Sequence, residues 1–286
     1  MNRREFLTAA AAGLGTAYIM PSVFGAAFDT PTLTKKIQAT DTVVLGKTGI
    51  KTSRLAMGTG TVGFAGGSNQ TRTGKLVPLL MSGYDGGLNF FDTSDSYGSH
   101  PQVAAALKEI PRDKAVVMTK CDERDPVEAK ADIDRYLREL GTDYIDICLI
   151  HCVTEGDWTT RYRGVMDVFE EAKEKGKIRA HGVSCHSIEA LRAAAKSPWV
   201  EVDLVRLNPV GAHMDADADT VISVIKEMRA QGKGIVGMKI LGQGAMRTRQ
   251  DEAIQFALGT GVLDAFTIGA ENRSEQKDLI RRVAAA

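Results

Sequence analysis

Short apolar segments alternate with longer amphipathic segments along most of the chain. The short segments are rich in Val, Ile, Leu and Phe, which is typical of strands that are buried on both faces. We expect these strands at residues 54–58, 88–92, 115–119, 144–150, 178–184, 203–208, 234–239 and 265–269. The segments between them place apolar residues at helical spacing. They predict helices over residues 74–84, 102–110, 127–140, 161–175, 188–196, 218–230, 251–258 and 274–283.

The clearest of these helices, 127–140, has signals at both of its ends. Asp125 can cap it, Pro126 suits its first turn, and Gly141 follows its last residue. Eight strands that alternate with eight helices at roughly 30-residue spacing predict an α/β fold of the (β/α)₈ TIM barrel type. A doubly wound sheet is the alternative. No G-x-G-x-x-G motif follows the first strand, which argues against a Rossmann dinucleotide domain.

A short β-hairpin is expected before the barrel. Its two arms are predicted at residues 43–45 and 53–55, on either side of the glycine-containing turn segment 46–49. No low-complexity linker or charge block interrupts the chain after residue 42. We therefore expect the hairpin and the barrel to form a single domain.

The beginning of the chain has the features of a twin-arginine export signal. Arg3 and Arg4 precede a run of small and apolar residues over 9–20, which is shorter than the roughly 20 residues that a membrane-spanning helix needs. We expect residues 1–27 to be a signal peptide read by the twin-arginine export machinery, and 28–286 to be a periplasmic domain. Because this route carries folded proteins, it also suggests a bound cofactor.

Composition narrows the classes of function. Of the 286 residues, 43% are hydrophobic and 25% are charged, which excludes a disordered chain and a protein with many membrane spans. The 36 basic and 36 acidic residues balance, so there is no electrostatic case for nucleic-acid binding. Four cysteines are too few for a disulfide scaffold. We expect a monomer without stable membrane insertion.

Four chemically active side chains follow consecutive predicted strands, at the end where barrels keep their chemistry. Asp92 and Tyr97 follow the second strand, Lys120 the third and His151 the fourth. A phenol has a pKa near 10, and a cation within about 4–6 Å lowers it. Lys120 could therefore make Tyr97 an acid–base group for carbonyl reduction. Asp92 could keep Lys120 charged, and His151 could donate a hydrogen bond to the carbonyl oxygen.

This quartet resembles the catalytic tetrad of the aldo/keto reductase family, in which Asp, Tyr, Lys and His occur in this order. Five motifs carry the resemblance across nearly the whole predicted domain: LGKTG at 45–49, FDTS through Tyr-Gly at 91–98, VMTK at 117–120, LGTDYID through His at 140–151, and GKIR through GVS at 176–184. The resemblance implies NAD(P)H-dependent reduction of an aldehyde or ketone, or the reverse oxidation of an alcohol. Its partner would be a small molecule.

The resemblance also marks cofactor residues, several of which depart from the family pattern. Ser184 is retained, whereas Cys185 stands where the family usually has an Asn. Arg206 replaces a Gln, and it could equally form a structural ion pair. Met238 replaces an aromatic residue that stacks on the nicotinamide, and its polarizable thioether can still lie against a ring.

The positions that contact the 2′-phosphate of the cofactor in the family are also altered. A Lys-Ser pair that grips a 2′-phosphate in the family is missing, and Gly269 stands there. Arg273 or Lys277 could substitute for it, so we expect NADP(H) to be slightly preferred over NAD(H). The remaining cofactor candidates are at strand ends: Gly58, Thr59 and Lys239.

Two other functions stay open. The altered cofactor positions would suit a catalytically weak protein that senses or binds the cofactor, although a binder has no need of all four catalytic side chains. A metal-dependent barrel could use Cys121, Cys152, Cys185 and His186, but their spacing is not a ligand motif and we expect no metal. The other histidines are expected to be structural or on the surface: His100, His181 and His213.

Overall fold

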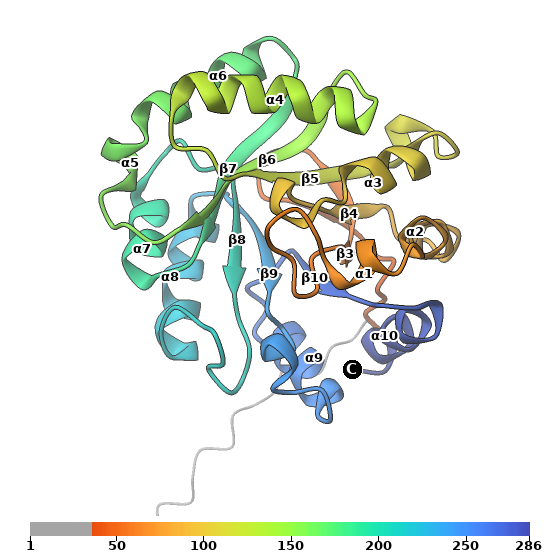
Figure 1. Ribbon diagram of the computed structural model, residues 1–286. Coiled ribbons are helices and arrows are strands. Elements are labelled where there is room, and N and C mark those ends of the chain that lie inside the picture. The colour runs from red at the N-terminus through yellow and green to blue at the C-terminus, as the bar shows by residue number, and fades with distance from the viewer. Residues whose placement is uncertain (1–35) are drawn as a thin grey trace, which may run out of the picture. The chain divides into compact units, whose positions relative to one another are not determined.

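The computed structural model describes residues 36–286, so the predicted signal peptide, 1–27, lies outside the described residues. Eight parallel strands form a closed barrel (Figure 1). Their order around the barrel follows the chain: β3 (Leu55–Gly58), β4 (Phe90–Asp92), β5 (Val116–Cys121), β6 (Ile145–Val153), β7 (Ile178–Cys185), β8 (Val202–Arg206), β9 (Gly234–Met238) and β10 (Ala265–Gly269). Pairing of β10 with β3 closes the ring. The predicted (β/α)₈ TIM barrel is confirmed.

Helices follow the strands and surround the barrel (Figure 1). They are α1 (Asn69–Arg72), α2 (Leu76–Asp85), α3 (His100–Leu107), α4 (Pro126–Leu140), α5 (Trp158–Arg161), α6 (Arg163–Glu174), α7 (Ile188–Lys196), α8 (Ala218–Ala230), α9 (Gln250–Gly259) and α10 (Arg273–Ala285). Three short 3₁₀ turns accompany them: η1 (Asp95–Tyr97), η2 (Arg112–Lys114) and η3 (Gly242–Gly244). Within the described residues, none of these helices has the length and apolar composition that crossing a membrane requires.

Side chains of each strand alternate between two apolar cores, as the pleat of a strand dictates. Phe90 of β4 and Met118 of β5 belong to the core inside the barrel. Their neighbours Phe91 and Val117 belong to the core between the strands and the helices. All four are fully buried, which explains why these strands appear as continuous apolar runs in the sequence.

The predicted hairpin closes the amino-terminal end of the barrel. It pairs β1 (Thr42–Val44) with β2 (Lys51–Ser53) in antiparallel fashion. The second arm ends at Ser53 rather than at Leu55, because Leu55 pairs with β10 as the first residue of the barrel. Leu45 and Ile50 lie between the two arms and extend the inner core. The carboxyl ends of the strands lie at the opposite end of the barrel.

Three strands run further toward their carboxyl ends than the sequence predicts, β7 by one residue and two others by more. β5 reaches Cys121 and β6 reaches Val153, two and three residues beyond the predicted limits of 119 and 150. Lys120 and His151 therefore lie on the strands themselves and not in loops. Side chains that project from strands are held more precisely than those on loops.

Candidate active site

Backbone strain gathers at the carboxyl ends of the barrel strands. Within residues 36–286, every non-glycine residue with a positive φ lies at the carboxyl end of a barrel strand or in the loop that follows it: Val62, Ala65, Cys152, His213, Lys239 and Gln243. Such conformations are costly for residues with a Cβ and cluster at functional sites. This end, which we call the mouth of the barrel, is therefore the candidate active site.

Lys120 is the centre of the four predicted catalytic residues. Its side chain is fully buried, and Nζ donates to Asp92 Oδ1 at 2.6 Å and to the carbonyl oxygen of Thr93 at 2.6 Å. Asp92 also accepts a hydrogen bond from Thr267 at 2.8 Å. Burial opposes the charge of Lys120, but Asp92 and Tyr97 outweigh it and raise the pKa of Lys120. Lys120 is thus a fixed cation in the mouth.

Tyr97 lies on η1, between Lys120 and the loop that follows β3. The centroid of its ring is 4.8 Å from Lys120 Nζ. A Cβ on Gly60 would come within 2.4 Å of this ring, and one on Gly63 within 2.6 Å, so only glycine allows the loop to approach so closely. Burial raises the pKa of Tyr97, although Lys120 opposes the shift. Tyr97 therefore stays protonated at neutral pH, beside a cation that favours release of its proton.

His151 joins the group from β6. The centroid of its ring is 6.0 Å from that of Tyr97 and 6.2 Å from that of His186. Its Nδ1 lies 2.7 Å from Asp122 Oδ1 and 3.4 Å from Ser94 Oγ. Burial lowers the pKa of His151 and outweighs the hydrogen bond to Asp122, which raises it. The structure therefore brings all four predicted catalytic residues together in the mouth.

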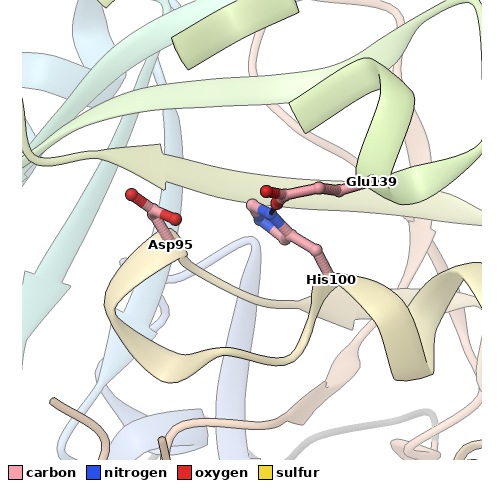
Figure 2. A group of neighbouring side chains, drawn as sticks. All are labelled: Asp95, His100 and Glu139. Atoms are coloured by element: carbon pink, nitrogen blue, oxygen red, sulfur yellow. Dashed lines mark hydrogen bonds and ion pairs between the residues drawn. The ribbon is translucent and has the colours of Figure 1, made fainter. Parts of the chain in front are cut away.

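Ion pairs hold the turn that carries Tyr97. Asp95, the first residue of this turn, lies close to His100 and Glu139, and the three side chains could offer ligands to a metal ion (Figure 2). The guanidinium of Arg135 pairs instead with both oxygens of Asp95, at 2.9 and 2.8 Å, and with Glu139 at 2.9 Å. Because this cation already neutralises the two carboxylates, we interpret the cluster as a structural network that fixes η1 on α4.

Ser184 is the cofactor candidate with the clearest geometry. It lies between Val183 and Cys185, whose side chains both point into the outer core, so its own side chain points into the barrel. Its buried hydroxyl has no hydrogen-bond partner among residues 36–286. A buried polar group without a partner costs about 1–3 kcal/mol. A nicotinamide carboxamide would supply the missing partner, so this position fits the cofactor.

Cys185 does not reach the mouth, contrary to the expectation that it replaces a cofactor-contacting Asn. It is the last residue of β7 and its side chain is fully buried in the outer core. Burial raises the pKa of the Cys185 thiol far above its usual value, and the neighbouring Asp203 and Asp215 add to the shift. The physical reason is strand alternation, because adjacent residues of a strand point to opposite faces.

Two cationic side chains and a thioether stand at or just after the carboxyl ends of β8 and β9. Arg206 Nε donates to Asp215 Oδ1 at 2.9 Å, so the structural ion pair considered for Arg206 is present. Met238 ends β9 within the inner core. Lys239 follows with a φ of 57°, and its ammonium forms no hydrogen bond or ion pair within residues 36–286. Burial, Arg206 and Lys120 lower the pKa of Lys239. An anion would relieve this excess of positive charge.

The four remaining cofactor candidates lie around β3 and β10. A Cβ on Gly58 would come within 2.9 Å of a threonine hydroxyl on β10, and one on Gly269 within 2.3 Å of a threonine hydroxyl in the β3–α1 loop. The hydroxyl of Thr59 donates to the carbonyl oxygen of Asp92 at 2.9 Å. Arg273 begins α10 and donates to a carbonyl oxygen of α2 at 3.3 Å. Each position has a packing role, and its cofactor role stays a prediction.

The cysteines form no ligand cluster within the described part of the chain. Cys121 and Cys185 are buried in the outer core, whereas Cys152 is exposed. Burial raises the pKa of Cys121 to about 12, so it is a thiol at neutral pH. Among residues 36–286, the cluster around Asp95 is the only group of His, Cys, Asp and Glu side chains close enough to hold a metal ion. It contains no cysteine, so the described residues do not bring together the cysteine ligands of the metal-dependent alternative.

Two of the other histidines have structural roles, as expected. His100 is buried, and its Nε2 lies 2.7 Å from the hydroxyl of Thr119. The ring of His181 stacks on Trp199 with a centroid distance of 4.3 Å. His213 lies in the loop after β8 and has a positive φ.

Sequence reasoning missed two residues that shape the mouth, Asp122 and Arg135. A usable signal existed for Asp122, because this carboxylate stands two residues after Lys120 and just past the end of β5. No such signal existed for Arg135. Its i, i+4 pair with Glu139 looks like an ordinary surface pair of a helix, and its other partner, Asp95, lies 40 residues away in the sequence.

A closed (β/α)₈ barrel with buried ionisable side chains at its mouth is the architecture of TIM-barrel enzymes. Residues 56–262 match the model of the aldo/keto reductase family, and the chain therefore belongs to that family. It is 28% identical to the NADH-specific methylglyoxal reductase of Escherichia coli K12, over 57% of this chain and 57% of that protein. It is 24% identical to L-galactose dehydrogenase of Arabidopsis thaliana, over 71% of this chain and 66% of that protein.

Solved structures show the likeness of fold. A putative aldo-keto reductase from Pseudomonas aeruginosa superposes with a TM-score of 0.72 at 22% identity, covering 87% of this chain and 96% of that one. The holo form of aldo-keto reductase AKR11C1 from Bacillus halodurans gives 0.71 at 20% identity, covering 86% and 91%. The chain aligns with about half to two thirds of the length of the curated relatives named above.

Proposed function

We propose that this protein is an oxidoreductase that uses a nicotinamide cofactor to reduce small aldehydes or ketones, or to oxidise the corresponding alcohols. The observation that carries the proposal is the buried cation of Lys120. It is hydrogen-bonded to Asp92 and lies against the ring of Tyr97. Membership of the aldo/keto reductase family supports it, as do the names of relatives that are a reductase and a dehydrogenase.

Residues of the mouth would hold the cofactor. When bound, the reduced nicotinamide supplies a hydride to the carbonyl carbon. Ser184 would bond to its carboxamide, and Met238 would lie against its ring. The cationic side chains of Lys239 and Arg273 would form ion pairs with its phosphates. The exposed Arg273 supports a slight preference for NADP(H), whereas the relative from Escherichia coli is NADH-specific, so both nucleotides belong in the test.

The chain's own residues would manage the proton. Tyr97 gives its proton to the carbonyl oxygen while negative charge develops there. Lys120 stabilises the phenolate that remains, because an opposite charge nearby favours the ionised form. Asp92 keeps Lys120 charged and in place, since an unpaired ammonium is costly in a buried site.

Tyr97→Phe tests this assignment. The phenyl ring keeps the packing against Gly60 and Gly63, so the affinity for NADH and NADPH, measured by fluorescence titration, should not change. The rate of methylglyoxal reduction should fall by about 10²–10⁴-fold, the usual contribution of a general acid. Tyr84→Phe, at a half-buried tyrosine of α2, is the matched control. An unchanged rate in Tyr97→Phe refutes the role, and nucleotide binding without turnover in the natural protein favours the binding-protein alternative.

We also propose that the protein is exported to the periplasm by the twin-arginine route. The support is the pair Arg3 and Arg4 ahead of a weakly apolar run. Replacing both arginines with lysine keeps the charge but removes the guanidinium pair. The variant should accumulate in the cytoplasm in a fractionation experiment, and unchanged export would exclude this route.

A further inference from the structure

The contact between Asp122 and His151 determines which nitrogen of the ring carries a proton. Nδ1 of His151 lies 2.7 Å from Oδ1 of Asp122. An ionised carboxylate only accepts hydrogen bonds, so a contact this short needs the hydrogen on Nδ1. The His151 side chain is 12% exposed and that of Asp122 is 42% exposed. The ring is therefore enclosed, while solvent reaches the carboxylate that holds it.

The surroundings keep Asp122 ionised. Burial opposes its charge, but the hydrogen bond and charge of His151, together with Arg124, hold the pKa of Asp122 below its usual value. Arg124 itself is fixed by donating to the backbone carbonyl oxygen of His151. The other groups that face or adjoin the ring are Lys120 of β5, Asp92 of β4, Tyr97 of η1, Ser94 before it, Cys152 of β6 and His186 after β7.

The second ring nitrogen is left for a ligand. Ser94 Oγ is the other neighbour of Nδ1, at 3.4 Å, and it can rotate its hydrogen to suit. Nε2 of His151 has no hydrogen-bond partner within residues 36–286, although the ring is enclosed. A neutral imidazole has one donor and one acceptor nitrogen. With the hydrogen on Nδ1, the neutral ring presents only a lone pair at Nε2.

We propose that Asp122 makes His151 a proton-transfer residue and not a neutral hydrogen-bond donor to the substrate. This inference rests on the proposed function and deepens it. A neutral His151 can only accept a proton or a hydrogen bond at Nε2. It can donate to a carbonyl oxygen only as an imidazolium, whose charge Asp122 balances. The donor role that the sequence suggested for His151 therefore requires a charged ring.

The proton and electron movements balance in both directions. In the reduction at low pH, when the ring is charged, the carbonyl carbon takes a hydride and the π electrons move to the oxygen. The oxygen then takes the Nε2 proton of His151 in place of the proton of Tyr97. The ring is left neutral, and its Nδ1–H still donates to Asp122. In the oxidation, Nε2 of the neutral ring takes the hydroxyl proton as the hydride leaves carbon. Tyr97 is then an acid that is protonated at neutral pH, and His151 is a second acid that acts only when its ring is charged, below its lowered pKa.

The position of the proton can be measured without any turnover. We would label the histidines of the full chain with ¹⁵N and assign the ring by comparison with His151→Gln. The neutral ring should be protonated on Nδ1. Asp122→Asn keeps an acceptor but removes the charge, so the pKa of His151 should fall by about one unit in a titration. Glu123→Gln, which removes the adjacent exposed carboxylate, should leave it unchanged. Protonation on Nε2, or equal shifts in both variants, overturns the inference.

Kinetics provide a readout that a merely structural role would not move. The low-pH limb of methylglyoxal reduction should shift about one pH unit toward acid in Asp122→Asn. The KM for nucleotide should not change. Asp122→Glu keeps the carboxylate, so it should leave the low-pH limb close to its position in the natural protein. A rate that falls equally at every pH refutes the proton-transfer role. If the natural protein binds no nucleotide, the proposed function fails, and the ¹⁵N measurement still decides where the proton lies.

Discussion

Two buried lysines, one at each end of the barrel, differ in their partners. Lys120, in the mouth, donates to the carboxylate of Asp92 and to one carbonyl oxygen. Lys233, just before β9 at the amino-terminal end, donates only to backbone carbonyl oxygens near the end of α7: Ala194 at 2.7 Å, Ala195 at 3.1 Å and Ser197. Both side chains are almost completely enclosed.

The partners decide what each lysine does. The last carbonyl groups of a helix lack partners within the helix, and Lys233 satisfies those of α7. Burial lowers the pKa of Lys233, although Asp203 opposes the shift. Lys120 has its pKa raised by Asp92 and Tyr97 against the effect of burial. Lys120, in the mouth, is thus the buried lysine in direct contact with ionisable side chains, whereas Lys233 contacts only backbone carbonyl groups.

The largest effect that this comparison predicts is for Lys120→Met. The rate of carbonyl reduction should fall by about 10²–10⁴-fold, because Tyr97 loses the cation that stabilises its phenolate. The variant should also lose about 3–5 kcal/mol of unfolding free energy, because Asp92 is left buried without its partner. Steady-state kinetics and denaturant unfolding measure the two losses separately.

A double variant separates the causes of these losses. Lys120→Met combined with Asp92→Asn removes the stranded charge, so much of the stability should return. The rate should stay low, since the cation is still missing. Recovery of the rate along with the stability would mean that Lys120 contributes only to folding, and the distinction from Lys233 would be lost.

Lys233→Met should show the opposite pattern. Three carbonyl oxygens lose the hydrogen bond from Lys233, although that of Ala195 keeps one from Gln231 at 2.8 Å. The loss should cost about 1–3 kcal/mol of unfolding free energy. Nucleotide affinity and the rate per folded molecule should stay at their natural values, because Lys233 lies at the end of the barrel away from the mouth. Thermal unfolding and kinetics below the transition temperature check this. A large loss of rate in the folded variant would contradict the separation of the two ends.

Apolar periodicity predicted the barrel well because its strands are buried on both faces. Lys120 could be found for a related reason, since a lysine at the end of such a strand has few structural explanations. The direction in which the Cys185 side chain points could have been predicted as well. Strand β7 extends one residue beyond the predicted end at 184, so Ser184 and Cys185 must point to opposite sides.

Other parts of the mouth depend on contacts that the sequence does not encode locally. Asp122 reaches His151 across 29 residues, and the contact forms only because β5 and β6 are neighbours in the barrel. The network of Arg135 joins α4 to η1 in the same way. Cofactor positions were transferred by resemblance, so residues that have partners inside the protein, such as Thr59, could not be recognised as occupied.

The smallest predicted effect concerns Arg135, which has a role at the mouth without lying in it. Arg135 grips both oxygens of Asp95, the residue that begins the turn ending at Tyr97. The pair is partly exposed, so Arg135→Gln should cost less than about 1 kcal/mol of stability. A small displacement of an acid–base group can still cost up to about 10²-fold in rate, and we expect about tenfold for this indirect contact. Nucleotide affinity should not change.

Graded and matched variants show whether this effect comes from positioning. Arg135→Lys keeps the charge but cannot grip both oxygens, so its kcat should lie between those of Arg135→Gln and the natural protein. Arg138→Gln removes an exposed charge from the same helix and should leave kcat unchanged. If Arg135→Gln and Arg138→Gln lowered kcat equally, the effect would come from the loss of a positive charge on α4 and not from the positioning of Tyr97. A raised KM for nucleotide with an unchanged kcat would show that Arg135 acts on the cofactor and not on Tyr97.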